Sequence, residues 1–190
     1  MKKRVMILAA TAAITGVMVT GCGSSKPVSV TKVNQEQEIS VPCAEYFTDG
    51  NFFRGVGVGQ SKDMNTAREK ARMAANTELA GSISTTIKQV SEKYVNDAGQ
   101  SQADYGETFE ALTKQVINQQ LNNLEVCCSK TTRTPDGLYK MYIAVQADAK
   151  KVFDALDRSA AADKKLETMY NREKFRANYD AEMAAFAKKQ

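Results

Sequence analysis

The chain contains no histidine and no tryptophan among its 190 residues. Without histidine it can form neither a Ser-His-Asp triad nor a Cys-His pair, and it cannot build a zinc site that uses imidazole. The three thiols at positions 43, 127 and 128 do not have the spacing of a metal site. We therefore expect no catalytic residues, no metal and no cofactor other than the lipid discussed below, and we expect the protein not to be an enzyme.

A strong charge of one sign is also lacking. The formal net charge is +4, but three of the 26 basic residues are Lys2, Lys3 and Arg4, in a segment that we expect to be removed. Subtracting those three leaves 23 basic against 22 acidic residues, a net charge of +1. A nucleic-acid partner would require a clustered basic face. We therefore expect none.

The first 21 residues have the layout of a signal peptide. A positive cluster at positions 2–4 precedes an apolar run from Val5 to Val19, which is followed by Thr20-Gly21-Cys22. The apolar run is shorter than the roughly 20 residues that a membrane-spanning helix needs. A cleaved signal fits this length, and a permanent span is the alternative.

The residues Val19-Thr20-Gly21-Cys22 resemble the lipobox of bacterial lipoproteins, which has an aliphatic residue, two small residues and the cysteine that is lipidated. The resemblance implies cleavage before Cys22, a diacylglycerol thioether on its sulfur and acylation of its amine. Two or more chains hold a protein firmly at a membrane. Gly23, by analogy with known sorting rules, favours the outer membrane of a Gram-negative bacterium. Ordinary secretory cleavage beside a coincidental cysteine remains an alternative.

Three cysteines remain in the exported chain, and exported proteins commonly form disulfides. Cys43 could pair with Cys127 or with Cys128, closing a loop of more than 80 residues. On the chain-entropy model such a bridge stabilises the fold by about 4 kcal/mol. Adjacent residues of a strand point to opposite faces, so we expect only one of the two to reach Cys43. The alternative is that all three serve as small core residues.

We expect residues 22–42 to form a lipidated tether and residues 43–157 to form an α+β domain. Its first strand spans Phe52 to Gln60, where Gly55, Gly57 and Gly59 alternate with valines and form one bare face. A long helix follows, beginning near Asp63 or Thr66, with alanines along one side of its first half. Small residues on both surfaces predict unusually close packing of helix on strand, a structural role for the three glycines.

After the long helix, the sequence predicts a loop over 96–106, a second helix over 107–121 and a hairpin of strands 124–132 and 138–146. The hairpin turn is Thr134-Pro135-Asp136-Gly137. A helix begins at Asp148, and residues 158–190 form a charged helical tail with an interrupted apolar stripe. We expect a small antiparallel sheet covered by the long helix. The tail is either a solvated helix or fraying coil, or a helix that binds a partner or a second copy of the chain. A membrane-surface helix is disfavoured by its interspersed Asp and Glu residues.

No motif for nucleotide binding or catalysis is evident. The run Gly55-Val56-Gly57-Val58-Gly59 fits neither the dinucleotide-binding pattern nor the P-loop, because its glycines lie inside a strand. No recognisable acid/base pair occurs among the carboxylates Asp49, Asp63, Glu69, Glu78 and Asp104. A glycosidase pair formed by residues far apart in the sequence stays open.

The lipobox, the strand Phe53-Arg54-Gly55-Val56-Gly57-Val58-Gly59, the helix with Ala67, Ala71, Ala75 and Leu79, and the later hairpin together resemble the LPP-twenty family of small envelope lipoproteins. The resemblance covers roughly residues 43–155. It implies an outer-membrane or surface lipoprotein and transfers no catalytic residue. We expect a non-enzymatic envelope protein that binds an envelope component or itself. A regulator of cell-wall or appendage assembly and an enzyme on envelope polymers are the alternatives.

Overall fold

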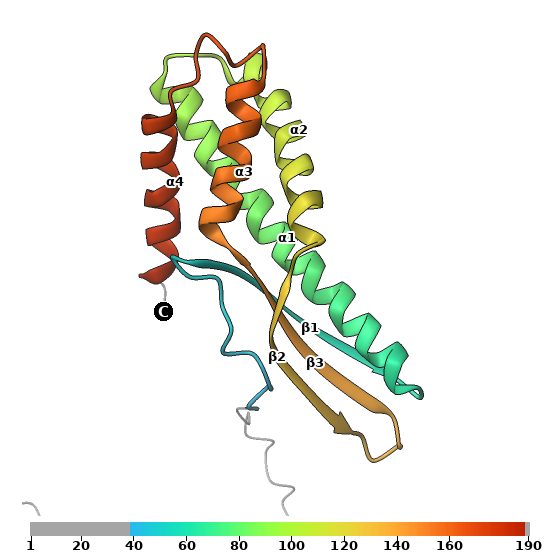
Figure 1. Ribbon diagram of the computed structural model, residues 1–190. Helices are drawn as coiled ribbons and strands as arrows, with labels where there is room; N and C mark the ends of the chain where they lie inside the picture. Colours follow the sequence, from blue (N-terminus) through green and yellow to red (C-terminus); the bar gives the residue numbers. More distant parts are fainter. Residues whose placement is uncertain (1–38, 189–190) are drawn as a thin grey trace, which may run out of the picture. The chain divides into compact units, whose positions relative to one another are not determined.

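The computed structural model describes residues 39–188 (Figure 1). The predicted signal peptide, Cys22 and the tether up to residue 38 lie outside the described residues. The elements in chain order are β1 (Phe52–Ser61), α1 (Met64–Asp97), α2 (Gln102–Leu121), β2 (Glu125–Arg133), β3 (Tyr139–Asp148), α3 (Ala149–Ala162) and α4 (Arg172–Ala187).

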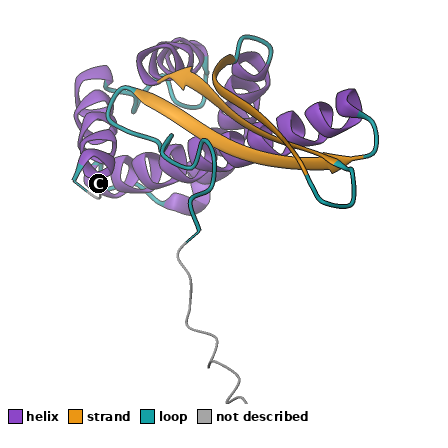
Figure 2. Ribbon diagram, turned by 90° about the horizontal axis from the view of Figure 1, so that it is seen from below, coloured by secondary structure: helices purple, strands orange, loops and turns teal. Residues whose placement is uncertain are grey.

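The three strands form one antiparallel sheet in the order β1-β3-β2, drawn in orange in Figure 2. β3 is central, and its Ile143 lies opposite Gly57 of β1 and Ser129 of β2. The predicted hairpin is β2–β3, and its turn has Gly137 at a φ of 80°. That backbone conformation favours glycine. The α+β class and the small antiparallel sheet are thus confirmed.

The N-terminal half of α1 packs on the glycine face of β1. A Cβ atom added to Gly55, Gly57 or Gly59 would collide with the backbone of α1, at Ala75, Ala71 and Ala67 respectively. Asp63 caps the start of α1, and its carboxylate accepts a hydrogen bond from the backbone N–H of Thr66 at 2.8 Å. The close packing predicted from small residues on both surfaces is present.

The C-terminal half of α1 extends past the sheet and packs with α2 and α4, while α3 lies against α2 and α4 (Figure 1). Aromatic rings fill this half. Phe109 and Phe175 stack with their centroids 5.7 Å apart, and Tyr94 meets both rings edge-on. The buried side chains of the described residues therefore form a small-residue layer at the sheet and an aromatic core among the helices.

Two predicted boundaries are wrong by more than two residues. α2 begins at Gln102 rather than at residue 107, because Tyr105 packs against the core and draws the polar stretch before it into the helix. The segment beyond residue 157 is part of the domain rather than a separate charged tail. Its apolar stripe is buried in the same core as α1, through Leu166, Phe175, Tyr179 and Met183.

Candidate functional site

A disulfide joins Cys43 to Cys128 across the sheet face that α1 leaves open. Of the two partners predicted for Cys43, the structure thus selects Cys128, while Cys127 is a free, half-buried thiol. Cys43 has a φ of 63°, an uncommon conformation for a residue with a side chain. The bridge packs with Tyr142 and Ala144 in a small core of its own, separate from the main one.

The two adjacent cysteines do not point to opposite faces, so that step of the prediction was wrong. A β-bulge lies between Val126 and Cys128, which face the consecutive residues Val145 and Ala144 of β3. Cys127 is the extra residue, and it packs against the same small core as the disulfide. A bulge interrupts the alternation of side chains that a regular strand imposes. Burial raises the pKa of the Cys127 thiol, and nearby Arg54 acts in the opposite direction.

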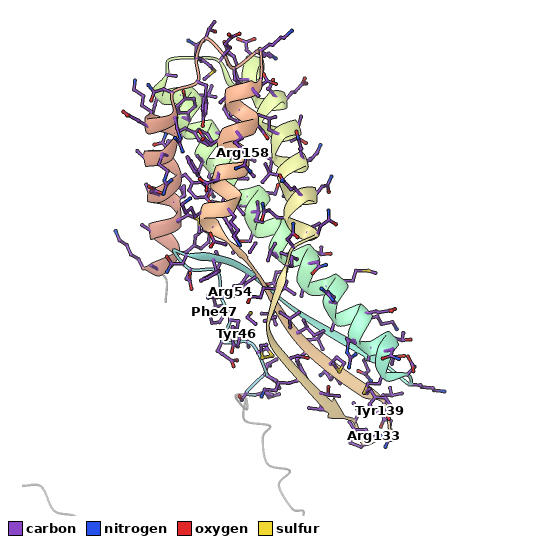
Figure 3. All side chains as sticks on the ribbon, in the orientation of Figure 1. Tyr46, Phe47, Arg54, Arg133, Tyr139 and Arg158 are labelled. Atoms are coloured by element: carbon purple, nitrogen blue, oxygen red, sulfur yellow. A yellow bond between two sulfur atoms is a disulfide. The ribbon has the colours of Figure 1, made fainter. Side chains whose placement is uncertain are left out.

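Residues 43–49, which we call the stapled segment, are fixed to the sheet at both ends. At the far end from the disulfide, Arg54 donates to the carbonyl of Phe47 at 2.7 Å, to the carboxylate of Asp49 at 2.5 Å and to Gln146 at 3.2 Å. Figure 3 shows Tyr46, Phe47 and Arg54 close together. Arg54 is the residue that sequence analysis missed. A single cation within a strand of glycines and valines was the available signal.

Within this network the positive charge of Arg54 is balanced by the negative charge of Asp49. Burial acts to raise the pKa of Asp49, but hydrogen bonds from the Asn51 backbone and the Arg54 guanidinium outweigh it, so the pKa lies below its ordinary value. The side chain of Arg54 is only 17% exposed. The Arg54–Asp49 pair therefore fixes the stapled segment to β1 without adding a net charge.

Side chains also occupy the outer edge of β1. The hydroxyl of Thr48 accepts from the backbone N–H of Arg54 at 3.0 Å, and the carboxylate of Glu78 accepts from that of Val56 at 2.7 Å. These bonds satisfy edge groups that would otherwise be open to another strand. Thr48, Glu78 and β1 are thereby held in one arrangement.

A groove of about 870 Å³ lies between the stapled segment, β1, α1 and α4. Most of its exposed lining is apolar, and Phe47 is 59% exposed at it. The two acidic side chains on it, Glu45 and Glu78, belong to exposed residues. We call this feature the apolar groove; it is lined by Ala44, Glu45, Tyr46, Phe47, Thr48, Arg54, Val56, Glu78, Ser82 and Phe186.

A second hollow, of about 460 Å³, is mostly polar. We call it the polar cleft, and three of its lining residues are the carboxylates Glu125, Asp148 and Asp154. Each already accepts a hydrogen bond: Glu125 from Gln146, Asp148 from the backbone of Lys151, and Asp154 from Lys150. The bond from Lys150 also lowers the pKa of Asp154.

General acid catalysis requires a carboxyl group that keeps its proton near neutral pH. The lowered pKa makes Asp154 unsuited to that role. Glu125 and Asp148 each accept a hydrogen bond from within the domain.

The chain was compared with protein-family models, with curated proteins and with solved structures, and no match was found. The resemblance to the LPP-twenty family therefore stays a prediction.

Within residues 39–188, no helix is long and apolar enough to cross a membrane. The same part of the chain holds no group of three or more acidic or cysteine side chains placed to bind a metal ion.

The carboxylates singled out in the sequence do not converge on one site. Asp63 caps α1, Glu78 caps the edge of β1 and Asp49 pairs with Arg54. Glu69 and Asp104 are exposed on α1 and α2. The glycine run contacts a helix along its whole bare face. The apolar groove and the polar cleft are instead formed by residues 43–49 with their neighbours and by the junction of α2, the sheet and α3.

Proposed function

We propose that the chain is a bacterial cell-envelope lipoprotein, anchored through a lipid on Cys22, that acts by binding another protein rather than by catalysis. The lipobox-like residues 19–22 support the anchor, and Gly23 supports the outer membrane of a Gram-negative bacterium. One observation carries the binding role: a preformed apolar groove whose wall is fixed by a disulfide at Cys43 and by the Arg54 network.

The groove defines the chemistry of its partner. Phe47 offers an exposed aromatic ring, and buried aromatic residues commonly dominate the energy of protein interfaces. Glu45 and Glu78 supply negative charge, whereas Arg54 is neutralised by Asp49. The partner is therefore a protein segment with an apolar side chain flanked by lysine or arginine.

The anchor is tested by replacing Cys22 with alanine in cells. We expect the variant to leave the membrane fraction and to migrate differently in gels, because it can carry no thioether-linked lipid. Retention at the membrane with unchanged mobility would show that Cys22 is not lipidated.

The groove is tested by placing a photo-crosslinking amino acid at position 47 or, as a control, at position 73. Met73 is a matched position because it is 70% exposed and does not line the groove. The segment crosslinked to position 47 is identified by mass spectrometry and synthesised as a peptide. We expect Phe47→Ala to weaken its binding at least about tenfold, and Met73→Ala to leave binding unchanged.

Charge complementarity gives an independent check with the same peptide. We expect Glu45→Gln to weaken binding mainly at low salt, because the exposed ion pair that it removes is screened at high salt. A peptide without basic residues, or equal crosslinking from positions 47 and 73, would contradict the proposed mode of binding.

The two alternative functions give different outcomes in the same experiments. A regulator of cell-wall or appendage assembly would crosslink through Phe47 to one enzyme or one component of that machinery. An enzyme on envelope polymers would instead shorten a polymer, and Glu125→Gln or Asp154→Asn in the polar cleft would abolish that activity. Shortening of this kind would overturn the non-catalytic proposal.

A further inference from the structure

The polar cleft is separate from the apolar groove and plays no part in the function proposed above. It lies where the C-terminal end of α2 meets the starts of β1 and β2, the end of β3 and one side of α3. Figure 3 shows one of its residues, Arg158, on α3. The lining residues are Phe52, Gln119, Gln120, Asn123, Glu125, Gln146, Ala147, Asp148, Lys151, Asp154 and Arg158.

Three primary amides line the cleft near the end of α2, those of Gln119, Gln120 and Asn123. Among residues 39–188 no hydrogen bond to these three side chains is found, in contrast to Gln146, which bonds both Arg54 and Glu125. A primary amide offers two donors and one acceptor oxygen. The cleft thus presents both donors and acceptors that the domain itself does not use.

The charges around the cleft compensate one another. The three carboxylates that line it are balanced by Lys151 and Arg158 and by Lys150, which bonds Asp154 from outside the lining. A strongly anionic or cationic ligand would therefore gain little from this surface and would lose hydration on entering it. The lining favours a neutral ligand with many hydroxyl and amide groups.

Phe52 adds an apolar surface to this lining. The guanidinium of Arg54 lies over its ring, 5.2 Å from the centroid. A ligand that presents C–H groups as well as hydroxyls can pack on an aromatic ring while its polar groups reach the amides. Sugar rings have this combination, and acetamido groups add a donor and an acceptor that match a primary amide.

We propose that the polar cleft binds a neutral glycan that carries acetamido sugars. Gln119, Gln120 and Asn123 hydrogen-bond its hydroxyl and acetamide groups, and Phe52 packs against a sugar ring. The domain would then hold a protein segment in the apolar groove and an envelope glycan in the polar cleft.

The test is a titration of the full chain, purified from membranes in detergent micelles, with tetra-N-acetylchitotetraose. Binding is followed by calorimetry and by ligand-observed NMR, with maltotetraose as a neutral glycan without acetamides. We expect Gln119→Ala and Asn123→Ala each to weaken binding about fivefold, the effect of one lost neutral hydrogen bond. Gln89→Ala removes an equally exposed helical glutamine outside the cleft and should leave the affinity unchanged.

Three results would overturn this proposal: no binding of chitotetraose at millimolar concentrations, equal binding of maltotetraose, or unchanged affinity in both cleft variants. Thermal unfolding of each variant shows whether a lost affinity reflects a lost fold. The glycan titration contains no partner protein, and Phe47→Ala should not change its result. Failure of the glycan proposal is therefore distinguishable from failure of the groove proposal.

Discussion

The two halves of α1 make opposite kinds of contact. At the sheet, alanines of α1 meet the bare backbone of three glycines, whereas among the helices its larger side chains meet aromatic rings. The buried face of α1 has only alanines in its first three turns, Ala67, Ala71 and Ala75, and larger apolar side chains after them, among them Leu79, Ile83, Ile87, Val90 and Tyr94. One helix therefore packs on the backbone of a strand at one end and on the side chains of α2 and α4 at the other.

The difference predicts opposite sensitivities. The sheet half has no room for added atoms, so substitutions that enlarge a side chain should destabilise it. The helical half depends on the contacts of large rings, so substitutions that shorten a side chain should destabilise it. Substitutions of each kind, placed in each half, test this contrast.

The largest effect is expected from Phe175→Ala. Phe175 is fully buried and lies within 5.7 Å, centroid to centroid, of Tyr94, Phe109 and Tyr170. Removing it leaves a cavity among rings that cannot close around it, which should lower the free energy of unfolding by about 3–5 kcal/mol. Urea unfolding measures the loss. A loss near zero would mean that the aromatic core does not hold α4 in place.

Gly57→Ala is expected to cost about 2–3 kcal/mol, toward the upper end for overpacking, because the atoms in the way are backbone atoms of α1. Gly81→Ala is the control. Gly81 lies in α1, the helix on which Gly57 packs, and a Cβ atom added to Gly81 meets nothing within 4 Å. That substitution should stabilise the protein by about 0.5–1 kcal/mol. Equal effects of the two substitutions would refute close packing as the role of Gly57.

Tyr94→Phe probes the polar tie within the helical half. The Tyr94 hydroxyl donates to the carbonyl of Met169 at 2.6 Å and accepts from the backbone N–H of Asn171 at 2.5 Å. The variant keeps the ring but leaves both groups without this partner, which should lower the free energy of unfolding by about 1–2 kcal/mol. Hydrogen exchange should quicken in α4 and not in β1. Uniform quickening would show that the two halves unfold together.

The smallest effect concerns alkaline pH. Burial is the main cause of a raised pKa for Tyr94, Tyr170 and Tyr179, all in the helical half. A tyrosine in the unfolded chain loses its proton near pH 10. The contribution of these three tyrosines to the free energy of unfolding is therefore complete below about pH 10 and declines as the pH rises above it. We expect the urea midpoint to fall from pH 9 to pH 11, and less steeply in Tyr179→Phe. The background is Cys127→Ser, which prevents thiol exchange. An identical slope in Tyr179→Phe would exclude that residue as a source.

Local features of the fold could be predicted from the sequence where neighbours in the chain determine the structure. The glycine strand, the cap at Asp63 and the turn before Leu138 depend on residues within a few positions of one another. The fate of the C-terminal segment could not be predicted, because an interrupted apolar stripe does not show which surface it meets. Leu166 and Tyr179 are buried only because α1, α2 and α3 leave a space for them.

The candidate sites were less accessible to prediction. The sequence left two possible partners for Cys43, namely Cys127 and Cys128. The β-bulge that places both of them at the same small core depends on how β2 pairs with β3, which the sequence of β2 does not show. The apolar groove and the polar cleft each collect residues from four or more segments. Spacing along the chain contains no signal for such convergence.

The Cys43–Cys128 bond also determines how the domain would respond to force. A pull on the chain at residue 43 passes through the bridge into β2, which is zipped to β3 along its length. The stapled segment and β1 are bypassed by this load path, whereas in a reduced protein the same pull would peel them from the sheet one residue after another. An anchored protein under tension would thus keep the wall of its apolar groove mechanically unloaded.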